Sequence, residues 1–384
     1  MEEMQKSSRI PGFGNLSIEE QARKWASFSR LDSKEFAELL ALMKRRDSPP
    51  LRAAPNFKIS FNGGTKEYIV PMVIEEASVV PAVSNGAKMT WNSGGFSATY
   101  TGSISHGYIE IRKVQGAEGV ARKLSVSKPL LLDRMNELGG HVSATGLSIK
   151  RSKYAGQESL ILKFSFDTGD AMGANKINGM LERVQPILAS LVGSKGKVEN
   201  GVLSNDSELR MVLVEASVRA EDVGGSRVAE DIAHFSEYGD TFAFRGVTNN
   251  KGIMNGAVGV LAAMDNDTRA AEAAAHRYAC RRCDYGSLSK WTIDKNGDLH
   301  GELALPAPFA TVGGAVGLYD QSRISRKLLS RNDEGNFHVG EFACIVGSAG
   351  LAANLAALRA HADEGIQRGH MRNFEQQKSE LQRK

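Results

Sequence analysis

The sequence predicts an α+β protein in which a large mixed α/β domain is interrupted by a small α+β domain. The chain has 384 residues, which is enough for two domains that each bury a core. Strand and helix patterns alternate through roughly one hundred residues in the middle of the chain, as in a compact α+β unit. After residue 210 the sequence becomes rich in Ala and Gly, and helical periodicity resumes. We therefore expect the chain to return there to the larger domain.

The first elements are expected to be two helices and a strand pair. A helix at 17–29 begins with Ser17 and Glu20, which fit a capping box. A second helix at about 34–46 has apolar residues on one face and ends before a Ser-Pro-Pro sequence. A strand pair over 57–73 turns at an Asn-Gly-Gly sequence.

The middle of the chain shows the alternating pattern. The segments 107–112 and 160–166 have apolar residues at every second position, which predicts two half-buried strands. A helix is expected near 126–138. The loop 167–173 leads into a further helix, whose apolar face carries Ile177, Met180, Leu181, Val184, Leu188 and Leu191.

The last part of the chain predicts mostly helices. Two helices are expected at 252–264 and 268–279, followed by a hairpin at 294–301 and a long apolar helix at 339–362. The residues from 372 onwards are almost wholly polar. We expect them to be mobile unless a ligand or partner orders them.

Composition excludes several classes of protein. The net charge of +4 is small, and no stretch combines Lys and Arg with aromatic residues as nucleic-acid-binding proteins do. A mildly basic chain still suits anionic ligands. No apolar run reaches the roughly 20 residues of a membrane helix, and no signal core follows the N-terminus. We therefore expect a cytoplasmic protein with no membrane or nucleic-acid partner. Three cysteines argue against a disulfide framework.

Three patterns resemble sites but have simpler explanations. Cys280 and Cys283 have CxxC spacing, yet only His276 is a further zinc ligand nearby. In the acidic segment 294–298 the Gly and the distal Glu do not fall where a calcium loop requires them, so a hairpin turn is the better explanation. Gly313-Gly314 follows a strand-like stretch, but no GxGxxG opens a βαβ unit. A dinucleotide site of the ordinary Rossmann type is therefore not expected.

Four short segments combine residue types that carry chemistry. They are Glu75-Glu76-Ala77-Ser78, Asp170-Ala171-Met172-Gly173-Ala174-Asn175, Asn250-Lys251-Gly252-Ile253-Met254-Asn255-Gly256 with Asp267 further on, and Gln367-Arg368-Gly369-His370-Met371. Taken singly, each has a plainer explanation, such as a strand-end charge, a helix cap, a surface lysine or a tail histidine.

Taken together, the segments resemble the signature set of class II (bacterial-type) 3-hydroxy-3-methylglutaryl-CoA (HMG-CoA) reductases. The match begins at Ser8-Arg9-Ile10-Pro11-Gly12-Phe13 and runs in the same order over nearly the whole chain. The combination of DAMGAN, NKGIMNG and EGIQRGHM is specific. The resemblance implies an oxidoreductase that interconverts HMG-CoA and mevalonate with two molecules of NADH or NADPH and no metal.

The resemblance implies roles for four ionisable residues. Lys251 would stabilise the oxyanion that forms when the carbonyl takes up hydride. Glu76 would donate a proton during reduction of the aldehyde, so burial should favour its protonated form. Asp267 would lie between Glu76 and Lys251 and tune both. His370 would protonate the departing CoA thiolate.

Further residues are implied to bind the two ligands. Substrate binding falls on Ser78, Arg245, Asn255 and Arg9. Arg245 is a suitable partner for the HMG carboxylate because a guanidinium matches two oxygens. Cofactor binding falls on Asp170, Met172, Gly173 and Asn175, since the N-terminus of the helix that follows suits a pyrophosphate.

The resemblance also implies how the chain is organised. The large substrate domain is expected at 1–105 and 211–357, a small ferredoxin-like cofactor domain at 106–210, and a mobile C-terminal flap at 358–384 that closes over the site. A homo-oligomer is implied, at least a dimer and commonly a hexamer, with active sites between subunits.

Two departures leave alternatives open. The ENVIG-type segment of the family is missing before residue 57, so a non-catalytic paralogue that binds CoA or a dinucleotide, or a reductase of another acyl-CoA, stays possible. Where some NAD-using members carry an acidic residue after the first small-domain strand, the alignment places Val114-Gln115-Gly116, after Arg112 and Lys113. The absence of an acid favours NADPH over NADH.

Overall fold

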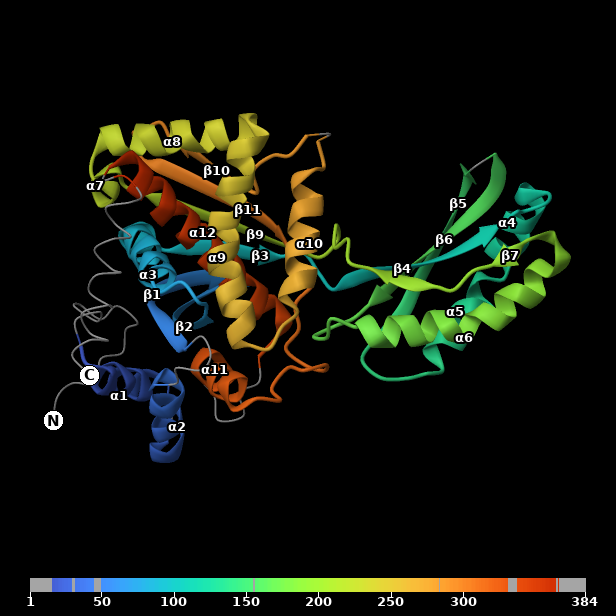
Figure 1. The fold of residues 1–384 in the computed structure, drawn as a ribbon, viewed down its shortest axis with the longest axis horizontal. Coiled ribbons are helices and arrows are strands. Elements are labelled where there is room, and N and C mark those ends of the chain that lie inside the picture. The colour runs from blue at the N-terminus through green and yellow to red at the C-terminus, as the bar shows by residue number, and fades with distance from the viewer. Residues whose placement is uncertain are drawn as a thin grey trace. The chain divides into compact units, whose positions relative to one another are not determined.

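A computed structural model describes residues 16–29, 32–44, 50–154, 156–282, 284–330, 337–363 and 365. The chain forms two compact units, each with its own core (Figure 1). The large unit comprises Met1–Tyr100 and Met211–Lys384, and the small unit comprises Thr101–Arg210. The small unit is therefore one continuous segment inserted into the large one.

A six-stranded sheet organises the large unit. Its strands, in spatial order, are β10 (Ser289–Ile293), β11 (Leu299–Pro306), β9 (Met211–Val218), β3 (Phe96–Tyr100), β1 (Leu51–Phe61) and β2 (Gly64–Val73). Only β1 and β3 pair in parallel. Along β9 the side chains alternate between buried Val and Ala and exposed Leu, Glu and Ser, so at this strand one face of the sheet packs on the core and the other faces outward.

The helices of the large unit pack around both faces of this sheet, since Leu51, Ala53 and Ile69 point away from the main core and into a smaller one. The helices are α1 (Ile18–Ser29), α2 (Ser33–Lys44), α3 (Val79–Thr90), α7 (Ala220–Val223), α8 (Ser226–Thr241), α9 (Ala243–Ala263), α10 (Thr268–Ala279), α11 (Asp320–Ser330) and α12 (Val339–Ala362). The helix α12 contacts β1, β3, β9 and β11 and also packs against α3, α8 and α9. It is the central element of the large unit (Figure 1).

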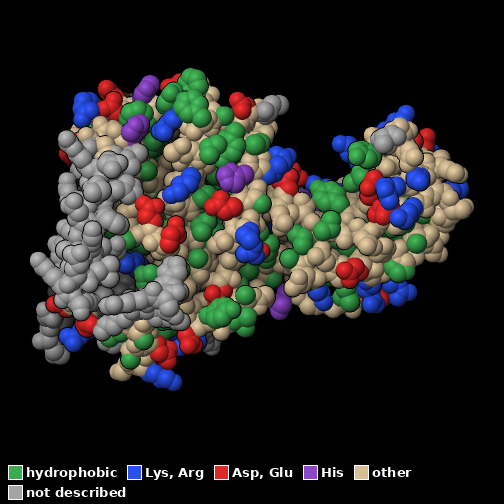
Figure 2. Space-filling model, viewed as in Figure 1, with side chains coloured by type: hydrophobic (Ala, Val, Ile, Leu, Met, Phe, Trp, Pro, Cys, Tyr) green, Lys and Arg blue, Asp and Glu red, His purple; other side chains and the backbone are tan. Residues whose placement is uncertain are grey.

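The helix α12 is apolar enough to cross a membrane by length and composition, although no such run was expected from the sequence. However, 89% of its most apolar window is buried inside the protein. A helix that is apolar all round and enclosed on all sides is a core helix. On the face shown in Figure 2, acidic and basic side chains are interspersed, as is usual for a protein surface exposed to water.

Two glycines let helices approach α12 closely. A Cβ atom on Gly256 of α9 would lie 2.2 Å from the carbonyl oxygen of Ala349, and one on Gly86 of α3 would lie 2.0 Å from that of Ala352. Neither position has room for any side chain. Gly256 therefore determines how closely α9 approaches the core helix. In the sequence it is only one of many glycines.

The small unit is a second, antiparallel sheet with helices on one face. Its strands, in spatial order, are β5 (Ser143–Tyr154), β6 (Gln157–Asp167), β4 (Ile104–Arg112) and β7 (Lys197–Val198), and β8 (Val202–Ser204) also pairs with β4. The helices are α4 (Ala117–Val126), α5 (Lys128–Asn136) and α6 (Ala174–Val192). The β-α-β-β-α-β order confirms the ferredoxin-like expectation.

Most expected elements are present, and the differences have local causes. The capping box of α1 forms, with Ser17 N donating to Glu20 and Glu20 N to Ser17. The helix expected at 126–138 is present as α5 (Lys128–Asn136), but a further helix, α4, was not expected and precedes it, the two meeting at Ser127. Pro129 accounts for the break, because proline fits the first turn of a helix but not its interior.

Candidate active site

Glu76, Ser78 and Lys251 converge on one point of the large unit. Glu76 and Ser78 lie in the loop between β2 and α3, and Lys251 lies on α9. The Lys251 ammonium is 3.7 Å from Glu76 Oε2, and the Ser78 hydroxyl donates to Glu76 Oε1 at 2.9 Å. The Lys251 side chain is 65% exposed and that of Glu76 36% exposed, so both can reach a ligand. A cation and an acid can therefore act on the same substrate oxygen.

The residue before Lys251 ties α9 to the start of β10. The side-chain oxygen of Asn250 accepts a hydrogen bond from the Leu288 backbone N–H at 2.9 Å, and its nitrogen donates to the Gly286 carbonyl at 2.9 Å. Asn250 is 1% exposed. An amide that pairs with a backbone in this way fixes both the position and the rotation of the helix that carries it.

Asn249 joins the same helix to α12 through a buried network. Asn249 donates to Ser287 Oγ at 2.7 Å and accepts from Asn354 Nδ2 at 2.7 Å. Asn354 Oδ1 accepts from Ser289 Oγ at 2.9 Å and from Trp291 Nε1 at 2.8 Å. Because indole N–H can only donate, the orientation of both amides is determined. The Lys251 helix is thus held against the core helix and β10 together.

Asp267 lies at the start of α10. Its Oδ1 accepts from the backbone N–H groups of Arg269 and Ala270, both at 3.0 Å, so it caps the N-terminus of α10. The Arg269 guanidinium lies 3.1 Å from the same oxygen. Among the described residues no ion pair joins Asp267 to Lys251. The structure therefore brings together Glu76 and Lys251 but gives Asp267 a capping role.

The two substrate-binding candidates on α9 occupy different faces. Asn255 follows Lys251 by four residues, so the two side chains lie one turn apart on the same face. Arg245 precedes Lys251 by six residues, which corresponds to about 9 Å along the axis and a rotation of roughly 240°. The Arg245 guanidinium instead lies 5.9 Å from the ring centre of Tyr238. Lys251 and Arg245 of one helix therefore point in different directions.

The expected cofactor loop, 167–173, is well defined in the small unit. It connects β6 to α6 and ends at Gly173, whose φ of +85° lies in the left-handed region. A Cβ atom there would lie 2.7 Å from Thr168 Cγ2, so only glycine fits. No side chain caps the N-terminus of α6. Its free N–H groups and the helix dipole suit an anion such as a pyrophosphate.

Hydrogen bonds to Asp167 help to hold this loop. The Ser103 hydroxyl and the Gly169 N–H both donate to Asp167 Oδ1, at 2.5 and 3.0 Å. These bonds favour the charged form. The donation from Ser103, and then that from Gly169, hold the pKa of Asp167 below its usual value of 3.8 against the effect of burial.

The turn at 114–116 is distant from this loop. Ile104 at the start of β4 pairs with Asp167, and Arg112 lies at the other end of the strand. Eight residues of strand correspond to roughly 26 Å. The Arg112 side chain is also bound to Glu199 at 2.6 Å. The register of β4 therefore argues against placing the cofactor ribose at 114–116.

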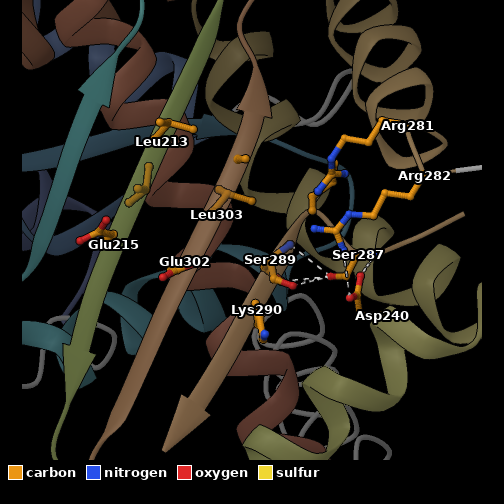
Figure 3. Close-up of a pocket in the computed structure, with 13 residues that line it drawn as sticks. Leu213, Glu215, Asp240, Arg281, Arg282, Ser287, Ser289, Lys290, Glu302 and Leu303 are labelled. Atoms are coloured by element: carbon orange, nitrogen blue, oxygen red, sulfur yellow. Dashed lines mark hydrogen bonds and ion pairs between the residues drawn. The ribbon is translucent and has the colours of Figure 1, made fainter. Parts of the chain in front are cut away.

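A separate pocket of about 300 Å³ opens on the outer face of the large sheet. It is lined by Arg281, Arg282, Lys290, Asp240, Glu215 and Glu302, among others (Figure 3). Arg282 lies 3.6 Å from Asp240, which also accepts from the Ser287 N–H. The cations and carboxylates balance one another, and neither Glu76 nor Lys251 lines this pocket.

A titratable chain runs along α10 beside the segment that anchors Lys251. His276 Nδ1 is 2.8 Å from the Tyr285 hydroxyl, and His276 Nε2 is 3.3 Å from Glu272. Burial raises the pKa of both Glu272 and Tyr285.

In the described part of the chain, no group of three or more His, Cys, Asp or Glu side chains lies close enough to hold a metal ion.

Two predicted site residues, Arg9 and His370, lie outside the described residues, as does Cys283 of the CxxC pair. Conversely, the hydrogen-bond network around Asn354 was not expected from the sequence. A signal for it exists, because Asn354 is a polar residue in the middle of an otherwise apolar helix, and a buried amide needs partners.

Known proteins resemble this chain over most of its length. Residues 48–374 match the family model "Hydroxymethylglutaryl-coenzyme A reductase". A 3-hydroxy-3-methylglutaryl-coenzyme A reductase from Archaeoglobus fulgidus is 37% identical, covering 95% of this chain and 85% of that protein. A probable reductase of the same name from Borreliella burgdorferi is also 37% identical, covering 84% and 73%.

Solved structures agree with these sequence matches. A 3-hydroxy-3-methylglutaryl-coenzyme A reductase from Streptococcus pneumoniae superimposes with a TM-score of 0.84 at 32% identity, covering 94% of this chain and 89% of that one. A structure described as the class II enzyme of the same organism, bound to NADPH in open conformations, gives a TM-score of 0.82 at 32% identity, covering 91% and 98%.

Proposed function

We propose, since the chain belongs to the hydroxymethylglutaryl-coenzyme A reductase family, that it reduces HMG-CoA to mevalonate at the cluster of Glu76, Ser78 and Lys251. The observation that carries this assignment is the 3.7 Å approach of the Lys251 ammonium to the Glu76 carboxylate. The chain is a nicotinamide-dependent oxidoreductase. What remains is how its own residues serve that reaction.

Lys251 and Glu76 supply complementary chemistry. When the nicotinamide cofactor is bound, it would supply two hydrides in turn, one to the thioester carbonyl carbon and one to the aldehyde that is left when the CoA thiol departs. The carbonyl oxygen then gains negative charge, which the Lys251 ammonium would stabilise. Glu76 would give its proton to the oxygen of the aldehyde, and the Ser78 hydroxyl orients Glu76 by its hydrogen bond. Asn255, on the same face of α9 as Lys251, would bind the substrate beside them.

Asp267 and His370 complete the proposed chemistry. Asp267 caps α10, so it would act on Lys251 through its negative charge rather than by direct contact. His370 and Arg9 are assigned from the resemblance alone. His370 would protonate the CoA thiolate as it leaves, carried on a flap that closes over the site. Arg9 would contact the substrate.

The loop 167–173 would hold the cofactor. The N-terminus of α6 offers free N–H groups, and Gly173 allows close approach to the loop backbone. Asp170, Met172 and Asn175 would contact the cofactor. We favour NADPH over NADH, because the Streptococcus pneumoniae relative is described as bound to NADPH. Equal or faster initial rates with NADH would reject this preference.

A homodimer with active sites between subunits is also part of the proposal. Arg245 and Lys251 point in different directions on one helix, so one ligand can meet both only if a second chain contributes. The aromatic side chains Phe242 and Phe244, beside Arg245, are 45% and 64% exposed. Exposed aromatic residues of this kind are typical of an interface.

The two alternatives are less well supported. A catalytically impaired paralogue is not favoured, because the family match spans most of the chain and Glu76 and Lys251 meet in space. A reductase of another acyl-CoA would need a reshaped pocket, and no feature of the described residues indicates one.

One assay tests the proposal. Purified protein mixed with HMG-CoA and NADPH should consume NADPH and form mevalonate. Lys251→Met should lower kcat by about 100-fold or more, as expected for loss of an oxyanion-stabilising group. Lys290→Met, which removes an exposed lysine of the same unit, serves as the matched control. Turnover of a different acyl-CoA alone, or full activity of Lys251→Met, would overturn the assignment.

A further inference from the structure

Arg210 is a fully buried arginine beneath the loop 167–173. Its exposed fraction is 0%, and it is the last residue of the small unit before β9 begins. Its Nη1 donates to Thr168 Oγ1 at 2.8 Å and to the Ala171 carbonyl at 3.1 Å. Burial of a guanidinium is unfavourable unless its hydrogen bonds are made. A loop that makes such bonds is therefore strongly tied to this side chain.

Thr168 transmits this contact to the end of the loop. Thr168 is fully buried, and its hydroxyl and N–H both donate to the Ser103 carbonyl, at 2.9 and 3.2 Å. Its methyl group occupies the space that a Cβ atom on Gly173 would need. Arg210, Thr168 and Gly173 thus form a continuous line from the buried cation to the N-terminus of α6.

The two atoms that Arg210 binds belong to residues that are next in sequence to those assigned to the cofactor. Asp170 lies between Thr168 and Ala171, and Met172 and Gly173 follow directly. Movement of either tether would displace Asp170. In addition, the guanidinium offsets the negative charge of the Asp167 carboxylate, whose pKa it helps to lower, next to the helix N-terminus that would receive a pyrophosphate.

We infer that Arg210 is a positioning residue for the nicotinamide cofactor. Its hydrogen bonds to Thr168 and to the Ala171 carbonyl fix the loop 167–173, and its positive charge lies on the buried side of the proposed pyrophosphate site. This inference rests on the proposed function, which assigns that loop to the cofactor. Arg210 does not touch the cofactor itself, because it is buried under the loop. A residue of purely structural importance would stabilise the small unit without changing cofactor affinity selectively.

The test measures NADPH binding to the full-length enzyme without substrate, by the fluorescence of the bound nicotinamide. Arg210→Met should weaken NADPH binding by about tenfold or more, since a charge-assisted contact is lost. Arg210→Lys keeps the charge but replaces the planar guanidinium with an ammonium on a shorter side chain, and should fall between Arg210→Met and the wild type. The KM for HMG-CoA should stay within about twofold in both, because the substrate cluster lies in the other unit.

Arg183→Met is the matched control. Arg183 belongs to the same unit but is exposed, and it binds the Arg134 carbonyl and Glu137 instead of the loop. It should bind NADPH as the wild type does. If Arg210→Met does not fold, as judged by circular dichroism, Thr168→Val removes the hydroxyl that Arg210 binds at nearly constant volume and should weaken NADPH binding in the same way.

A loop variant separates the two proposals. If Asp170→Ala binds NADPH like the wild type, the loop is not the cofactor site, and the proposed function loses its cofactor assignment. If Asp170→Ala weakens binding but Arg210→Met, or Thr168→Val in its place, does not, then only the role of Arg210 is refuted. Equal losses of NADPH and HMG-CoA affinity in the Arg210 variants would reduce Arg210 to a structural residue.

Discussion

The carboxylate of Glu76 has a neutral and a charged neighbour, the Ser78 hydroxyl and the Lys251 ammonium. Both interactions hold the group in a fixed orientation. Glu75, the adjacent residue, is exposed and shares neither contact. The two glutamates therefore differ in surroundings although they are neighbours in sequence, which offers an internal control.

Glu76→Gln should lower kcat by roughly 10²–10⁴-fold, the usual contribution of a general acid. Glutamine keeps the shape and can still accept from Ser78, but it has no acidic proton to give. Glu75→Gln should leave kcat close to the wild-type value. Steady-state kinetics with HMG-CoA and NADPH measure both. A Glu75→Gln defect as large as that of Glu76→Gln would show that the wrong carboxylate has been assigned.

Asp167 makes the stability of the small unit depend on pH. Its folded-state pKa lies below 3.8 because Ser103 and Gly169 donate to the carboxylate. A lowered pKa contributes stability that is present above the unfolded value and is lost as pH falls through the folded value. The free energy of unfolding of the wild type should therefore exceed that of Asp167→Asn most at neutral pH.

Denaturant unfolding of both proteins from neutral pH down to about pH 3 checks this. The difference should shrink as the pH falls below 3.8, the usual value for this carboxyl group. Ser103→Ala removes the largest cause of the lowered Asp167 pKa. In that background the free energies of unfolding with Asp167 and with Asp167→Asn should differ less at neutral pH. A difference that stays constant with pH would mean that the charge of Asp167 contributes nothing.

At the scale of elements, the packing of α9 on α12 determines where Lys251 lies. Gly256 permits close contact, because a Cβ atom there would lie 2.2 Å from the Ala349 carbonyl oxygen. Asn249 and Asn250 then fix the rotation of the same helix. The position of the ammonium is thus set by residues that never meet the substrate.

Gly256→Ala should destabilise the protein by about 1–3 kcal/mol or more, because α9 must move away from the core helix. Gly252→Ala is the control one turn earlier on α9. Nothing lies within 4 Å of a Cβ atom there, so this change should stabilise by up to about 1 kcal/mol through helix propensity. Urea unfolding compares the two; equal effects would contradict the close-contact explanation.

The sequence predicted the long apolar helix and the last hairpin, but β3 and β9 were not expected, although β9 alternates between buried and exposed side chains. The helix expected at 339–362 has the bounds of α12, and the hairpin at 294–301 is formed by β10 and β11. The strand β5 was not expected, because most of its side chains are exposed and an exposed strand carries no apolar alternation. The start of α9 was placed nine residues too late, since Ala243–Lys251 mixes polar and apolar residues without a single face.

The candidate site could be predicted only in part. Residue type and order indicated Glu76 and Lys251, but their 3.7 Å approach depends on how α9 packs beside β2, which local pattern does not encode. Asp267 shows the opposite case. Its place at the start of a helix indicated a favourable interaction with the helix dipole, and in the structure it caps that helix. The buried role of Arg210 could not be seen in the sequence, where a lone arginine is normally exposed.

At the scale of the whole molecule, the exposed aromatic residues before Lys251 lead to a prediction about assembly. Phe244→Glu should shift the proposed dimer towards a monomer and lower activity with it, because a buried interface does not tolerate an unpaired charge. Light scattering and activity at several protein concentrations measure this. Val126→Glu, a change at a 78% exposed residue of the small unit, should leave the mass unchanged. A Phe244→Glu dimer of full activity would place the interface elsewhere.

The insertion of the small unit between β3 and β9 has a consequence for synthesis. These two strands pair in the large sheet, yet the ribosome makes the whole small unit between them. The small unit is continuous and can fold first. Its two ends are then joined by the bond from the Thr101 hydroxyl to the Leu209 carbonyl, 3.2 Å long. Once the small unit has folded, its two ends hold β3 and β9 close to each other. The two strands then lose little further entropy when they pair, although the chain between them is long.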